Sequence, residues 1–133
     1  MGNTTEAEKF NKLAIENAES ILHSLVSQGA PPSDIDKMRR VLSDRKGNLA
    51  IVYLQQDRFV EAFTLLESLL IEDKRTAYIR GLVVKQGTLG QFYLKQGEIN
   101  SAEQVFQSAL TFIRRRDENL YGVDWNDDVT NEL

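Results

Sequence analysis

The feature that most constrains this sequence is an internal repeat with a period of 40 residues. In each copy a tyrosine is followed nine residues later by an alanine, which would let two helix backbones approach closely. A period of this size is typical of folds that repeat one supersecondary unit. The first copy contains Asn48, Leu49, Ala50, Tyr53, Phe59, Ala62, Leu66 and Leu69, and the second contains Thr88, Leu89, Gly90, Tyr93, Ile99, Ala102, Phe106 and Ala109.

The repeated unit is expected to be a pair of α-helices. Apolar residues recur at intervals of three and four along most of the chain, which predicts amphipathic helices, and no segment alternates apolar and polar residues as a strand does. Short turns between long helices make sequence neighbours antiparallel. The helices are expected over residues 5 to about 28, 33 to about 56, 59 to 70, about 73 to 96, and 99 to 116.

Several residues are expected to mark the helix ends. Gly29, the adjacent prolines at 31 and 32, and Gly97 are stop signals, because glycine favours a left-handed C-terminal position and proline cannot continue a helix. Polar residues just before an apolar register are candidates for N-terminal caps. The cap candidates are Ser33, Asp57 and Asn100.

The repeat resembles the tetratricopeptide repeat, whose pattern is Leu, Gly or Ala, Tyr, Ala, a large residue and a small residue. The resemblance covers residues 44 to 116, and the second copy matches better than the first. Lys46 and Gln86 stand where the family has an aromatic residue, and the closing proline is missing. A 40-residue period instead of about 34 is similar to the long-helix variants found in kinesin light chain. The resemblance implies a short α-solenoid of stacked antiparallel helix hairpins.

A single domain is the expectation for 133 residues. We assign residues 1–116 to a helical repeat domain and residues 117–133 to an acidic tail or capping segment. The tail has few residues that could be buried, namely Tyr121, Val123 and Trp125. A generic helical bundle, in which the tyrosines and alanines are ordinary core residues, is the alternative to the repeat fold.

Composition argues against several classes of function. The net charge is −4, from 16 basic and 20 acidic residues, so nucleic acid is not expected as the main partner. The run Arg114-Arg115-Arg116 is the local exception, and it fits either a solvated helix end or a contact with an acidic partner. With no cysteine, no positively charged leader and no long apolar run, the expectation is a cytoplasmic protein without a membrane span.

The residues needed for catalysis are scarce. His23 is the only histidine, cysteine is absent, and no glycine-rich phosphate loop ending in Gly-Lys occurs. The adjacent Asp127 and Asp128 lack the spacing of a calcium loop. We therefore expect no enzymatic activity, no cofactor and no metal site.

The resemblance implies where a partner would bind. In the tetratricopeptide family, the first helices of successive hairpins line a concave groove that holds a peptide or a partner helix. An ordinary solvated helix face is the alternative interpretation of the same positions. Transferred by register, the groove positions are Asp44, Asn48, Ile51 and Gln55 on one helix, and Val84, Thr88, Gln91 and Lys95 on the next.

Three functional hypotheses follow. The first is a protein-interaction module, such as an adaptor, scaffold or assembly subunit. The second is a peptide-sensing regulator, and the third is a structural subunit that associates with further copies of itself. The carboxylate clamp of co-chaperone repeats is disfavoured, because Val84 and Thr88 occupy its Lys and Arg positions although Asn48 fits.

Overall fold

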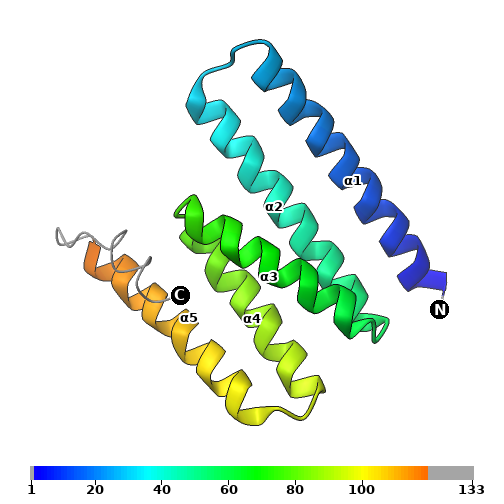
Figure 1. Ribbon diagram of the computed structural model, residues 1–133, viewed down its shortest axis with the longest axis vertical. Helices are drawn as coiled ribbons and strands as arrows, with labels where there is room; N and C mark the ends of the chain where they lie inside the picture. The colour runs from blue at the N-terminus through cyan, green and yellow to red at the C-terminus, as the bar shows by residue number, and fades with distance from the viewer. Residues whose placement is uncertain (1, 120–133) are drawn as a thin grey trace. The chain divides into compact units, whose positions relative to one another are not determined.

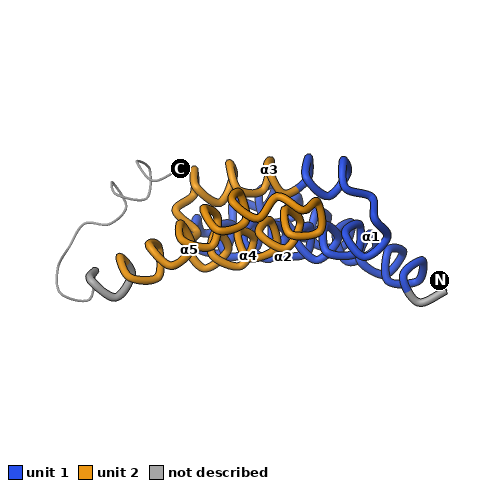
Figure 2. Tube along the Cα trace, turned by 90° about the horizontal axis from the view of Figure 1, so that it is seen from below, with its two compact units in different colours: residues 1–65 blue, residues 66–133 orange. Residues whose placement is uncertain are grey.

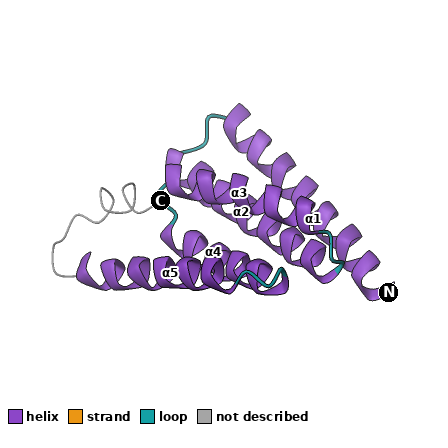
Figure 3. Cartoon of the chain, turned by 60° about the horizontal axis from the view of Figure 1, so that its bottom comes forward, coloured by secondary structure: helices purple, strands orange, loops and turns teal. Residues whose placement is uncertain are grey.

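Five α-helices make up the part of the chain that the structure describes (Figure 1). This computed structural model describes residues 2–119, with side chains from residue 4 to residue 115. Within that range no strand occurs, which confirms the all-α prediction (Figure 3). Of the expected tail, residues 117–133, the first three belong to the last helix, and the remainder from residue 120 on, with Tyr121, Val123 and Trp125, lies outside the described residues. The helices are α1 Gly2–Ser27, α2 Pro32–Gln55, α3 Phe59–Arg75, α4 Ile79–Lys95 and α5 Ile99–Asn119.

The chain divides into two compact units, Met1–Leu65 and Leu66–Leu133 (Figure 2). In the first unit, α1 and α2 form an antiparallel hairpin whose helices pack against each other. In the second unit, α4 and α5 form another such hairpin, and the C-terminal half of α3 belongs to the same unit. The core of the second unit contains Ile79, Leu82 and Phe112, with Leu70 and Val83 packed against them.

The ends of the helices recur after 40 residues, as the sequence motifs do. Helix α2 ends at Gln55 and α4 ends at Lys95, while α3 begins at Phe59 and α5 begins at Ile99. The small residues of the repeat are buried, with Ala62 and Ala102 both at most 1% exposed. A side chain at Gly90 would collide with the ring of Phe106, so the glycine of the second copy is needed for close packing of α4 and α5.

Four helices end in the same way, with a residue in the left-handed conformation. At the end of α4, the Gly97 N–H donates to the Leu94 carbonyl at 3.0 Å and the Glu98 N–H donates to the Tyr93 carbonyl at 2.8 Å. This pair of bonds is the Schellman motif, which satisfies carbonyls that a helix end would otherwise leave open. The left-handed residues are Gly29, Asp57, Ala77 and Gly97.

Two of these ends correct the sequence prediction. Asp57 was expected to cap the N-terminus of α3, but its φ of 57° makes it the left-handed residue that ends α2. Asp73 was expected to begin the fourth helix, but α3 continues to Arg75 and α4 begins only at Ile79. Ala77 makes the break, with a φ of 53°. An alanine there gives no glycine or proline signal, so the sequence pattern placed the boundary several residues too early.

The other expected caps also differ in the structure. The N-cap of α2 is Pro31, which makes no side-chain capping bond, and Pro32 begins the helix with Ser33 inside its first turn. Helix α5 begins at Ile99, so Asn100 also lies within the first turn. Proline is favoured at the first position of a helix because its φ is already helical and it lacks an N–H that would need a partner. The prolines therefore begin α2 as well as preventing the continuation of α1.

Candidate functional site

The predicted groove residues of α2 form one exposed face. Asp44, Asn48, Ile51 and Gln55 are spaced by four, three and four residues, which places them on one side of a helix. All four are exposed, and the Ile51 side chain is 37% exposed. The residues between them are mostly buried, including Leu49, Ala50, Val52, Tyr53 and Leu54.

The predicted groove residues of α4 form a similar face, with one exception. Val84 is 59% exposed, and Gln91 and Lys95 are also exposed. Thr88 is only 8% exposed, and its hydroxyl donates to the Val84 carbonyl at 3.3 Å. The exposed face of α4 therefore includes Val84, Gln91 and Lys95, while the Thr88 hydroxyl bonds within its own helix.

Helix α4 has no other exposed face. At 100° per residue, all its exposed side chains fall within a stripe about 100° wide, and the rest of the helix is buried or half-buried. We call this set the α4 stripe: Arg80, Val84, Gln91, Leu94 and Lys95. The two halves of the predicted groove lie in different units, with α2 in the first and α4 in the second.

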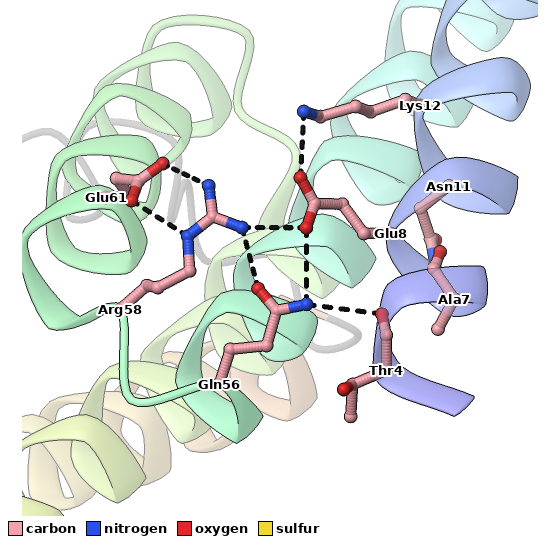
Figure 4. A network of polar contacts seen from close by, with 8 residues as sticks. All are labelled: Thr4, Ala7, Glu8, Asn11, Lys12, Gln56, Arg58 and Glu61. Carbon is pink, nitrogen blue, oxygen red and sulfur yellow. Dashed lines mark hydrogen bonds and ion pairs between the residues drawn. The ribbon is translucent and has the colours of Figure 1, made fainter. Parts of the chain in front are cut away.

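A network of polar side chains in the first unit joins the start of α1 to the turn between α2 and α3 (Figure 4). The Glu8 carboxylate accepts hydrogen bonds from Lys12 Nζ at 2.9 Å, Arg58 Nη1 at 2.7 Å and Gln56 Nε2 at 3.2 Å. Arg58 also donates to both carboxylate oxygens of Glu61, at 2.8 and 2.5 Å. Its guanidinium lies 4.2 Å from the centre of the Tyr53 ring.

The electrostatics of this network favour a structural role. The hydrogen bonds from Lys12 and Gln56, with the nearby charge of Arg58, lower the pKa of Glu8 to about 2. The hydrogen bond to Glu61 raises the pKa of Arg58 above its usual value. A carboxylate with so low a pKa stays ionised at neutral pH and is a poor general acid or base. Glu8 is therefore suited to a structural contact between α1 and the turn after α2 rather than to proton transfer at neutral pH.

The second unit holds an ion pair that the sequence analysis did not find. Lys85 Nζ lies 2.7 Å from Asp73 Oδ2, and the two side chains are only 3% and 1% exposed. The Lys85 ammonium also lies 5.4 Å from the centre of the Tyr78 ring. A side chain at Gly81 would come within 2.5 Å of both Asp73 Oδ2 and the Tyr78 ring. Because Gly81 has no side chain, there is room beside it for the buried pair.

One signal in the sequence could have revealed the pair. Lys85 follows Gly81 by one helical turn, in a helix whose neighbouring residues are mostly apolar. A lysine in such a segment is rarely buried unless it has a partner. Asp73, however, lies on a different helix, so the sequence pattern alone does not identify it as that partner.

The described part of the chain shows neither a metal-ligand cluster nor a membrane-spanning helix. Between residues 2 and 119, no group of three His, Cys, Asp or Glu side chains could hold a metal ion. No helix in that range is both long and apolar enough to cross a membrane. His23 lies exposed on α1. Comparison with protein-family models, with curated proteins and with solved structures finds no match to this chain.

Proposed function

We propose that this protein is a non-enzymatic interaction module that binds a peptide or a partner helix, as an adaptor, scaffold or assembly subunit does. The observation that carries the proposal is the α4 stripe. Helix α4 is largely buried and has one exposed face, and that face mixes aliphatic, amide and cationic side chains. Interfaces between proteins commonly combine an apolar centre with a polar rim.

The stripe has a physical advantage as a binding surface. Its side chains stand on a helix whose remaining residues, such as Leu82, Leu89 and Phe92, are anchored in the core. A partner would meet a backbone that is already ordered, so binding would lose little conformational entropy in the backbone of this protein. The exposed face of α2 at Asn48, Ile51 and Gln55 shares this property within the first unit.

Membership of the tetratricopeptide family is part of the proposal. It is supported by the recurrence of helix ends after 40 residues and by the contact of Gly90 with Phe106. We also propose a cytoplasmic location, since a chain without cysteine suits a reducing compartment.

Charge reversal on the α4 stripe tests the proposed function. A partner isolated by affinity capture and then purified is titrated calorimetrically against the wild type and against Gln91→Glu with Lys95→Glu. We expect the double variant to lose at least tenfold in affinity, because a charge placed against an unsuitable partner group at an interface is strongly unfavourable. Its thermal midpoint should change little, because both positions are exposed.

The matched control makes the same charge changes on α5, as Gln104→Glu with Arg114→Glu, since both of these residues are exposed. The control should bind as the wild type does. Wild-type affinity in the α4 variant, or equal losses in both variants, would contradict the assignment of the binding face to α4.

Self-association is a second candidate, favoured by apolar side chains outside the α4 stripe. On α1, Phe10 is 71% and Leu13 is 64% exposed, and on α5 Leu110 is 64% exposed. Large exposed apolar residues that cluster on a surface often mark contacts with other proteins. Mass measurement across a range of concentrations distinguishes the two candidates: a chain that stays monomeric while it binds a peptide fits the interaction module alone.

A further inference from the structure

The α4 stripe differs in charge from the chain as a whole. The sequence has a net charge of −4, but no acidic residue occurs anywhere in α4. Of the three cations of this helix, Lys85 is buried in its ion pair with Asp73, while the side chains of Arg80 and Lys95 are exposed. The only charges in the stripe are therefore positive, and they lie near its two ends.

The centre of the stripe is uncharged. Val84 is 59% and Leu94 is 49% exposed, and Gln91 supplies an amide that can both donate and accept hydrogen bonds. The distance along the helix from Arg80 to Lys95 is about 22 Å, from 15 residues at about 1.5 Å each. An extended peptide covers that distance with about seven residues at about 3.3 Å each.

From this arrangement we propose that the α4 stripe binds an acidic peptide segment, with carboxylates about seven residues apart and aliphatic residues between them. The inference rests on the proposed function and specifies the partner of the same site. Carboxylates at both ends would match Arg80 and Lys95, and Arg in particular can hold a carboxylate through two parallel hydrogen bonds. The aliphatic residues would cover Val84 and Leu94 and remove them from water.

The same chemistry disfavours the other charge classes of partner. A basic peptide would bring like charges together, and a neutral peptide would form no ion pair with either cation. Nucleic acid would match the charge, but single strands are held largely by stacking on aromatic side chains, and the α4 stripe contains none. The aliphatic centre of the stripe instead fits the side chains of a peptide.

Selection from a displayed library of random twelve-residue peptides tests this inference on the full chain. We expect the enriched peptides to contain Asp or Glu well above the frequency in the starting library, with two of them six to eight residues apart. Enriched peptides without an acidic excess would overturn the inference and leave the proposed function in place. A selection that enriches no peptide would contradict both.

Titration of the best selected peptide then tests whether α4 supplies the charge. Substitution of Arg80→Gln with Lys95→Gln should weaken binding about tenfold, and raising the salt concentration should weaken wild-type binding. The matched control removes two exposed cations of the same unit outside α4, as Arg75→Gln with Arg114→Gln, and should stay within about twofold of the wild type. Equal losses in the two variants would overturn the assignment to α4.

Two further probes separate peptide recognition from simple charge attraction. The selected peptide with its acidic residues replaced by Gln or Asn should bind about tenfold more weakly. A twelve-nucleotide single strand of thymidine should bind much more weakly than the acidic peptide at the same salt concentration. Binding of the oligonucleotide as tightly as the peptide would overturn the proposal of a peptide partner.

Discussion

The two units differ in the setting of the ion pairs that join separate elements of the chain. In the first unit, the Glu8 and Arg58 side chains of the network are 18% and 32% exposed, and Glu61 is 52% exposed. In the second unit, Lys85 and Asp73 are 3% and 1% exposed. The chemistry is the same in both, an ammonium or guanidinium against a carboxylate, but water reaches only the first.

This difference determines what each pair contributes to folding. Charges that water can reach stay solvated when a partner is removed, so exposed ion pairs add little to stability. A buried charge that loses its partner has neither water nor a counter-charge, so its removal from water is not compensated. The second unit should therefore be sensitive to changes at its buried ion pair, and the first unit should tolerate changes in its exposed network.

The largest expected effect is loss of one member of the buried pair. Lys85→Met leaves the Asp73 carboxylate in the core without its ammonium, which should lower the free energy of unfolding by about 3–5 kcal/mol. Urea unfolding followed by circular dichroism measures the change. In the first unit, Arg58→Met should lower the free energy of unfolding much less.

A double variant tests whether burial is the cause. Lys85→Met with Asp73→Leu replaces both charges by apolar side chains, and it should recover most of the stability lost in the single variant. A double variant as unstable as Lys85→Met alone would mean that the pair contributes mainly through shape, and the contrast between the two units would fail.

An intermediate effect is expected from the glycine beside the buried pair. Gly81→Ala places a methyl group within 2.5 Å of Asp73 Oδ2 and the Tyr78 ring, so the pair must shift, at a cost of about 1–3 kcal/mol. The matched control is Gly87→Ala on the same helix, where nothing lies within 4 Å of the new methyl group. The control should gain about 0.5–1 kcal/mol, because alanine favours the helix. Similar melting temperatures for the two variants would contradict the close packing at Gly81.

The smallest effect is expected from the exposed network and depends on pH. Because the pKa of Glu8 is lowered from 4.5 to about 2, its contribution to stability is present in full above about pH 4.5. It is lost as the pH falls towards 2 and Glu8 becomes protonated in the folded state. This contribution is measured by comparing the melting temperatures of the wild type and of Glu8→Gln between pH 7 and pH 2. The difference between the two proteins should shrink as the pH falls, and a constant difference would show that Glu8 does not act through its charge.

The sequence predicted more of the fold than of the site. Five helices, the stop at Gly29 and Gly97, and the recurrence of structure after 40 residues all follow from local patterns, because helix periodicity and glycine at helix ends are local properties. The groove positions could be listed from the repeat register, and seven of the eight are exposed as a binding face requires. Thr88 differs because its hydroxyl bonds to its own helix and its side chain is buried.

The sequence by itself determined the helical class, the helix count within the described residues and the phase of the repeat. Only the tertiary structure decided that α3 continues beyond Asp73 and ends before the left-handed Ala77. It also decided that Lys85 of α4 forms an ion pair with Asp73 of α3. It also decided that α4 exposes a single stripe. The physical reason is that burial, and with it the partner of a buried charge, depends on the approach of segments distant in sequence. Helix propensity and periodicity depend mainly on near neighbours.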